Sequence, residues 1–209
     1  MPALTLFHTA KAHVATFNAL APQADLAHVV RPDWLARAQG GIDAALEHEI
    51  KTTLQAARTP VLCSCTTIGE IAEAAGATRI DWPMMTLAAQ TGGPVLLAYC
   101  LDSTLSPSSA LLRRAFAQSE HPADISPLDL TSSWPLYTTG ATAPFAAAIT
   151  AAIATRLEQH PETRAVILAQ ASMAPAAPGL RALTDMPVFT SPDTALRALL
   201  PAHLIKTDH

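Results

Sequence analysis

Short apolar runs alternate with stretches of helical spacing along most of the chain. Apolar residues recur every four positions at Leu46, Ile50 and Leu54, with Ala45 beside them, which is typical of one helix face. The predicted strands are 4–7, 25–30, 61–64, 95–100, 123–130, 166–169 and 188–189. The predicted helices are 10–20, 42–57, 68–75, 83–89, 106–117, 143–159, 175–183 and 192–200, with a short one from Trp34 and loops at 79–83 and 132–142. This alternation predicts an α/β fold with parallel sheets.

The pattern restarts at Gly92-Gly93-Pro94, which predicts two lobes. We expect an N-terminal α/β lobe over 1–92 and a C-terminal α/β lobe over 93–191, with the C-terminal helix 192–209 packing back on the first lobe. At 209 residues the chain is long enough for two small, closely packed lobes. Each is expected to be Rossmann-like, with a short, mostly parallel sheet flanked by helices.

The composition argues against several classes of function. Half of the residues are hydrophobic, 14% are charged and the formal net charge is -4, so we expect a compact soluble protein that does not bind nucleic acid. The longest apolar stretches, 95–101 and 145–154, are shorter than the roughly 20 residues of a membrane span, so no membrane association is expected. No secretory signal is visible, and three cysteines cannot all pair. These features predict free thiols in a reducing cytoplasm, without a metal site.

One stretch, 61–70, combines a strand end with reactive side chains. Cys65 follows a short apolar run and precedes a helical pattern, so it is predicted to lie at a strand-to-helix turn. Such turns lie at the carboxyl ends of parallel strands, where open α/β sheets bind ligands. A helix start also favours an ionised thiol. The alternative is a buried structural cysteine, and Cys63, inside the strand, is more simply a core residue.

The motif Cys65-Thr66-Thr67 after an apolar strand resembles the first cysteine motif of the aspartate/glutamate racemase superfamily. Further motifs fit in the same order: His8-Thr9, Asp81-Trp82-Pro83-Met84, Ser103-Thr104-Leu105 and residues 166–173. The resemblance implies two similar α/β lobes with the active site in the cleft between them and one catalytic cysteine from each lobe. It also implies no cofactor and is compatible with a homodimer. The superfamily includes amino-acid and hydantoin racemases, maleate isomerase and arylmalonate decarboxylase.

The sequence departs from this pattern where the second cysteine is expected. Gln170-Ala171-Ser172 stands there, and no cysteine follows Cys100. Inversion at a carbon requires proton delivery from the face opposite to removal, and Gln170 is neither an acid nor a base. We therefore expect an enzyme that uses the single thiol of Cys65 at the α-carbon or double bond of a small carboxylate, as an isomerase, racemase or decarboxylase. Two alternatives are a non-catalytic protein that binds small carboxylates or amino acids, and a site completed by Cys100.

Seven other residues are predicted to bind the substrate. Their hydroxyl, imidazole or amide groups follow strand ends, and free N–H groups at helix starts bind carboxylates. Each has a simpler interpretation as well: a hydroxyl can cap a helix, a histidine can hydrogen-bond a loop, and Gln170 and Ser172 can cap the helix predicted at 175–183. The predicted substrate-binding residues are His8, Thr66, Thr67, Ser103, Thr104, Gln170 and Ser172.

Overall fold

In the computed structural model, residues 1–206 are described and belong to two units. Unit 1 comprises Met1–Asp81 together with residues 192–206, and unit 2 comprises Trp82–Ser191. The backbone N–H of Lys206 donates to the carbonyl of Leu20, which attaches the C-terminal segment to unit 1. Residues 207–209 of the predicted C-terminal segment lie outside the described residues.

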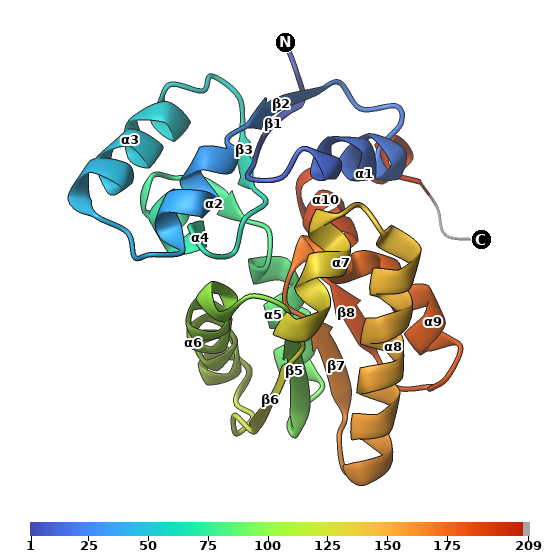
Figure 1. Cartoon of the computed structure of the whole chain (residues 1–209). Helices are drawn as coiled ribbons and strands as arrows, with labels where there is room; N and C mark the ends of the chain where they lie inside the picture. The colour runs from blue at the N-terminus through green and yellow to red at the C-terminus, as the bar shows by residue number, and fades with distance from the viewer. Residues whose placement is uncertain (207–209) are drawn as a thin grey trace. The chain divides into compact units, whose positions relative to one another are not determined.

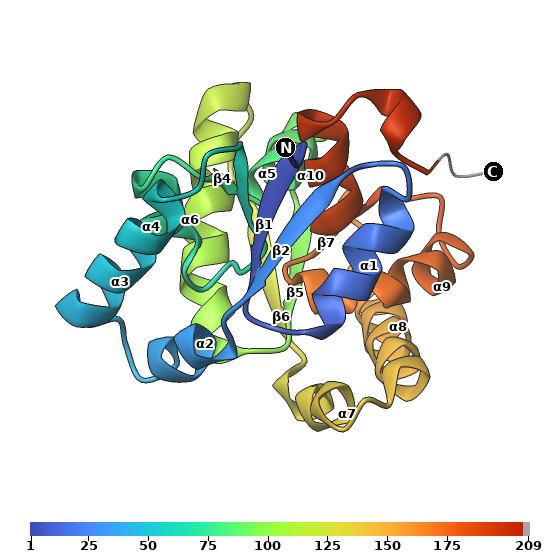
Figure 2. The same ribbon diagram turned by 90° about the horizontal axis from the view of Figure 1, so that it is seen from above.

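Unit 1 contains a parallel sheet with strand order β2-β1-β3-β4. Helices α2, α3 and α4 cover one face of this sheet, and α1 covers the other (Figure 2). The strands are β1 (Leu4–His8), β2 (Leu26–Val30), β3 (Val61–Cys63) and β4 (Thr78–Arg79). The helices are α1 (Ala12–Leu20), α2 (Pro32–Ala38), α3 (Ala44–Gln55), α4 (Gly69–Ala74), α10 (Ser191–Leu199) and the 3-10 turn η3 (Ala202–Leu204).

Unit 2 contains a second parallel sheet, with strand order β6-β5-β7-β8. Helices α5 and α6 cover one face, and α7, α8 and α9 cover the other (Figure 1). The strands are β5 (Val95–Tyr99), β6 (Ile125–Asp129), β7 (Ala165–Leu168) and β8 (Val188–Thr190). The helices are α5 (Trp82–Gln90), α6 (Asp102–Ser119), α7 (Trp134–Thr138), α8 (Thr142–Gln159) and α9 (Ala177–Arg181), with 3-10 turns η1 (Thr131–Ser133) and η2 (Ala171–Ala176).

The two sheets repeat one topology. In each, the first strand of the unit lies between the second and the third, so β5 corresponds to β1 and β7 corresponds to β3. Both sheets are covered on both faces, which explains why their central strands are apolar runs rather than alternating ones. This arrangement confirms the predicted α/β fold with two parallel sheets.

Three local predictions differ from the structure. Thr78–Arg79 forms the short edge strand β4 where a loop was predicted, because two residues without an apolar run carry no strand signal. Helix α6 begins at Asp102, one turn before the predicted start at Ser106, with an acidic residue in its first turn. A helical turn, α7, lies within the predicted loop because Trp134 and Tyr137 stack at 4.8 Å and pack on Phe145.

Candidate functional site

Two cross-strand pairs of side chains lie at the carboxyl edge of the unit 1 sheet. Phe7 of β1 pairs with Cys63 of β3, and the N–H of Ser64 donates to the carbonyl of Phe7 at 2.9 Å. Continuing this register places His8 opposite Ser64 and Thr9 opposite Cys65. Side chains alternate along a strand. The pair His8–Ser64 therefore lies on the face covered by α1, and the pair Thr9–Cys65 lies on the opposite face.

Cys65 is held by hydrogen bonds at this edge, but its thiol is not ionised. Its sulfur interacts with the side chains of Thr9 and Thr67 and with the backbone of Thr67 and Ile68, and these contacts favour the thiolate. Burial outweighs them and raises the pKa of the Cys65 thiol above its ordinary value. The expectation of an easily ionised thiol was therefore wrong. The following helix, α4, has only six residues and begins at Gly69, too short and too late to offset the burial.

Thr66 and Thr67 form the turn between Cys65 and α4. The carbonyl of Thr66 accepts the N–H of Gly69 at 3.0 Å, and Thr67 contacts the thiol of Cys65. The residue at the N-cap of α4 is Ile68, so neither threonine occupies the capping position that the simpler interpretation assigned to it. Thr66 and Thr67 therefore both lie next to Cys65, after the end of β3.

Cys63 is a core residue, as its position inside the strand predicted. It is fully buried among the residues that pack β1 and β3 against α2, α3 and α4. Burial raises the pKa of its thiol far above the ordinary value, and its Sγ lies 3.7 Å from the carbonyl oxygen of Cys65. Its contribution is to packing rather than to chemistry.

His8 belongs to a chain of hydrogen bonds that sequence reasoning did not identify. Its Nδ1 lies 2.7 Å from the Oγ of Ser64, and its Nε2 lies 2.8 Å from the Nδ1 of His28. The chain continues from the Nε2 of His28 to the Oδ1 of Asn18, a distance of 3.0 Å, and the Nδ1 of His13 lies 3.4 Å from Ser64 Oγ. The available signal was the placement of His8 and Ser64 at the ends of two predicted strands and of His28 within a third, but using it requires the order and register of the strands.

At the corresponding edge of unit 2, Gln170 occupies the place that Cys65 has in unit 1. Cys65 and Gln170 each lie two residues after the end of their strand, β3 or β7. The side-chain oxygen of Gln170 accepts the backbone N–H of Cys100 at 2.6 Å. The hydroxyl of Ser172 is buried without a hydrogen-bond partner among the described residues. The side chain of Gln170 is therefore bound to the backbone of Cys100, and it does not cap the 3-10 turn η2 that follows it.

Cys100 is a buried thiol of the unit 2 core. It packs with residues of α8, including Phe145 and Ile149. Burial, and secondarily the carboxylate of Asp129, raise the pKa of Cys100 to about 12. At neutral pH this thiol is also protonated.

Ser103 and Thr104 lie in the first turn of α6, directly after β5. Thr104 is buried, and its N–H donates to the carbonyl of Leu101 at 2.9 Å. Helix α6 has 18 residues, so its first turn lies at a substantial positive dipole end. The structure thus places this predicted pair at a helix start on the carboxyl edge of the second sheet.

The fold resembles several solved enzyme structures. A glutamate racemase from Francisella tularensis aligns with a TM-score of 0.63 and 13% identity over 100% of this chain and 84% of that chain. An allantoin racemase from Klebsiella pneumoniae aligns with a TM-score of 0.61 and 14% identity over 94% of this chain and 85% of that chain. An arylmalonate decarboxylase aligns with a TM-score of 0.59 and 14% identity over 94% of this chain and 90% of that chain. The chain has the fold of the aspartate/glutamate racemase superfamily. No family model and no curated protein matches the sequence.

Within this racemase fold, a buried ion pair supports the turn that follows Cys65. Arg79 donates two hydrogen bonds to Asp81, at 3.1 and 3.0 Å, and both side chains are at most 4% exposed. The guanidinium packs on Gly69, at the start of α4. Asp81 therefore pairs with Arg79.

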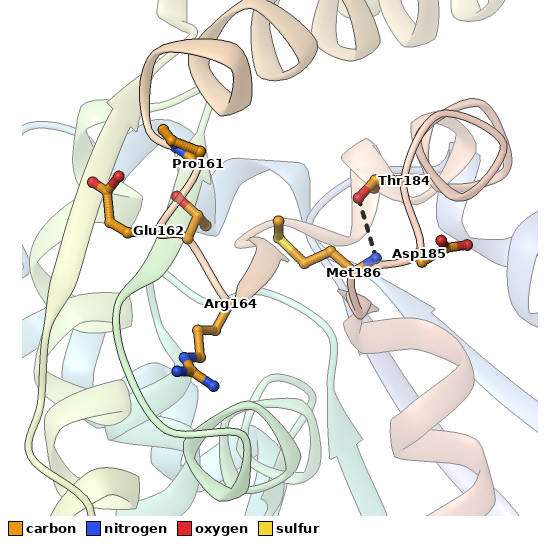
Figure 3. A pocket seen from close by; sticks show the side chains of 7 residues that line it. Pro161, Glu162, Arg164, Thr184, Asp185 and Met186 are labelled. Atoms are coloured by element: carbon orange, nitrogen blue, oxygen red, sulfur yellow. Dashed lines mark hydrogen bonds between the residues drawn. The ribbon is translucent and has the colours of Figure 1, made fainter.

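A surface hollow of unit 2 lies away from the residues predicted to bind substrate. It is lined by the loops before β7 and β8, and Thr184 Oγ1 accepts the N–H of Met186 at 3.1 Å in one of them (Figure 3). Both loops precede their strands, so the hollow lies at the amino edge of the sheet. Ligands of open α/β sheets bind at the carboxyl edge.

Two features are absent from residues 1–206. Within that range there is no group of three or more histidine, cysteine or acidic residues arranged to hold a metal ion. No helix in the same range is long and apolar enough to cross a membrane.

Proposed function

We propose that the protein is an enzyme that uses the protonated thiol of Cys65 as a proton donor to the α-carbon of a small carboxylate. The observation that carries this proposal is the buried thiol at the carboxyl edge of β3, whose pKa is raised and whose sulfur contacts hydroxyl and backbone groups rather than a cation. A neutral thiol is suited to give a proton to a carbanion or enolate. Without prior ionisation it is poorly suited to remove one.

The chemistry requires no cofactor. In a decarboxylation, the bond to the departing carboxylate breaks and its electron pair forms an enolate. The Sγ–H proton of Cys65 then passes to the carbon, and the thiolate regains a proton from water. Thr66 and Thr67 are proposed to bind carboxylate or enolate oxygens through hydroxyl and N–H groups, which stabilise the developing charge.

Unit 2 offers a second set of proposed carboxylate-binding groups. Ser103 and Thr104 lie at the start of an 18-residue helix, where N–H groups favour anions. Ser172 has a buried hydroxyl with no partner among the described residues, which is available to a ligand oxygen. We assign Gln170 a positioning role for the Cys100 backbone, because its side-chain oxygen is engaged there.

The solved structures that share this fold suggest the substrates to test. Their names include glutamate racemase, crystallised with D-glutamate, aspartate racemase, allantoin racemase and arylmalonate decarboxylase. We would therefore incubate the protein in D₂O with glutamate, aspartate, allantoin and phenylmalonate, and follow α-deuteration and decarboxylation by NMR.

Substitution of the thiol tests the proposal on whichever compound reacts. We expect Cys65→Ala to reduce turnover by at least about 100-fold, the usual contribution of a positioned acid. Cys63→Ala, a buried thiol in the same core, is the matched control, and Cys100→Ala tests the two-thiol alternative. Undiminished turnover by Cys65→Ala would refute the proposal, whereas loss of turnover in Cys100→Ala would favour a site with two thiols.

A binding protein is the second candidate, and the engagement of Gln170 by the Cys100 backbone favours it. Gln170, which is neither an acid nor a base, stands at the position where the resemblance to the racemase superfamily implies a second cysteine. In that case the same four compounds would raise the melting temperature without α-deuteration or decarboxylation. Thr67→Val would then reduce the thermal shift, while Cys65→Ala would leave the compounds chemically unchanged, as in the parent.

A further inference from the structure

The hydrogen-bond chain in unit 1 has a defined direction. The side-chain oxygen of Asn18 can only accept, so the Nε2 of His28 must carry a proton, and in a neutral ring its Nδ1 then accepts. It follows that His8 donates from Nε2 to His28 and accepts at Nδ1 from the hydroxyl of Ser64. Every proton in the chain therefore points from the interior toward Asn18.

All three rings must be neutral for this chain to exist, and their surroundings enforce neutrality. Burial, together with the nearby His13 and His28, lowers the pKa of His8 to about 3. Burial lowers the pKa of His13 to about 4 and also lowers that of His28. The aromatic ring of Phe17 packs on His8 at 5.3 Å, and no carboxylate contacts the three imidazoles among the hydrogen bonds of the described residues.

The buried end of the hydrogen-bond chain is His13, which has one ring nitrogen without a partner among the described residues. Ser64 Oγ has its second interaction with His13 Nδ1, at 3.4 Å, the longest link. Since the Ser64 proton points to His8, His13 donates from Nδ1, and its Nε2 is left as a bare acceptor. That nitrogen is buried and has no hydrogen-bond partner among the described residues. The outer end reaches the surface, because His28 is partly exposed and Asn18 is exposed.

We propose that His13, Ser64, His8 and His28 form a proton relay that takes a proton at the buried Nε2 of His13 and releases one to water at His28. This relay rests on the proposed function, to which it adds the base that the protonated thiol of Cys65 does not supply. The substrate class is a small carboxylate that carries a hydrogen on its α-carbon.

Protons balance along the relay without charging any ring. A substrate α-proton binds His13 Nε2 and leaves its electron pair on carbon as an enolate. The Nδ1 proton of His13 passes to Ser64, the Ser64 proton to His8 Nδ1, the Nε2 proton of His8 to His28 Nδ1, and the Nε2 proton of His28 to water. Each group gains one proton and loses one, which suits imidazoles that resist protonation. The reversed tautomers then return a proton by the opposite sequence.

The resting state of the relay can be tested without a substrate. Long-range ¹⁵N–¹H NMR of histidine-labelled protein at pH 7 should show neutral rings protonated on Nδ1 for His13 and on Nε2 for His8 and His28. His48→Gln removes an exposed ring and should leave these signals in place. A charged ring, or the opposite tautomer at His8 or His28, would overturn the relay even if no substrate were found.

Its function is tested by His28→Gln. Glutamine can keep both hydrogen bonds of His28 but cannot exchange tautomers, so we expect α-deuteration in D₂O to fall about 100-fold and to recover when imidazole is added. Ser64→Ala should give the same loss, and His48→Gln should have no effect. Parental α-deuteration in His28→Gln refutes the relay, while parental turnover in Cys65→Ala refutes only the proposed role of the thiol. Decarboxylation needs no base, so it should survive His28→Gln.

Discussion

The side-chain oxygen of Gln170 accepts the backbone N–H of Cys100 at 2.6 Å, joining the ends of β7 and β5. The corresponding strand ends in unit 1 are joined by the contact between Thr9 and the thiol of Cys65. One topology thus carries two different links: a hydroxyl–thiol contact in unit 1 and an amide–backbone hydrogen bond in unit 2. At the strand end where unit 1 has a thiol, Gln170 thus has a structural role: it accepts a backbone hydrogen bond.

Removal of the Gln170 side chain should destabilise the protein. Gln170→Ala leaves the buried N–H of Cys100 without its acceptor, which costs about 1–3 kcal/mol of unfolding free energy. Urea denaturation measures this loss. Gln159→Ala, at the exposed end of α8, should change the unfolding free energy by less than about 0.5 kcal/mol. Equal effects of the two substitutions would contradict the importance of the Gln170 hydrogen bond.

Breaking the buried Arg79–Asp81 pair should be more costly. Asp81→Asn leaves the Arg79 guanidinium buried without a counter-charge, and the expected loss is about 3–5 kcal/mol in urea denaturation. Glu47→Gln breaks the exposed pair with Lys51 and should cost less than about 1 kcal/mol. A loss below about 1 kcal/mol for Asp81→Asn would show that the guanidinium finds other partners.

Gly69 leaves room for that guanidinium. A Cβ at this position would lie 2.9 Å from Arg79 Nε, and Asp81 restrains the guanidinium from moving away. We expect Gly69→Ala to lower the unfolding free energy by about 1–3 kcal/mol. At Gly40 an added Cβ would meet its nearest atom at 3.8 Å, so Gly40→Ala should be tolerated. Comparable melting temperatures for the two variants would contradict this steric argument.

The neutral histidines should make the protein sensitive to mild acid. The pKa values of His8 and His13 are lowered from 6.5 to about 3 and about 4, so only the unfolded chain takes up these protons as the pH falls below 6.5. Their stabilising contribution is complete above that pH. It is lost on acidification toward the folded-state values, by up to about 1.4 kcal/mol per pH unit for each ring. Urea denaturation between pH 7 and 5 measures the slope.

A variant without one ring should show a smaller slope. His8→Gln removes one of the histidines whose pKa is lowered by folding, so we expect the pH dependence of the unfolding free energy to fall by up to about 1.4 kcal/mol per pH unit in this range. His48→Gln removes an exposed histidine and should keep the parental slope. An unchanged slope in His8→Gln would contradict the assignment. Comparing slopes avoids confusion with the stability that the substitution itself removes.

Local sequence features determined much of the fold and part of the site. Apolar runs and helical spacing depend on neighbouring residues, so they predicted the parallel α/β lobes and the position of Cys65 at a strand end. Two-residue β4 escaped prediction because it is defined by its pairing with β3, earlier in the chain. The helical turn α7 escaped because it is held by ring contacts among Trp134, Tyr137 and Phe145. Periodicity does not record such contacts.

Only the tertiary structure decided the chemistry of these strand ends. The link from His8 to Ser64 and His28 depends on the order and register of three strands, which are set by long-range packing. The protonation of Cys65 depends on burial, and a strand-to-helix position alone indicated the opposite direction of its pKa. The sequence located the thiol. The packing around it determined that the thiol stays protonated and that neutral imidazoles lie at the same edge of the sheet.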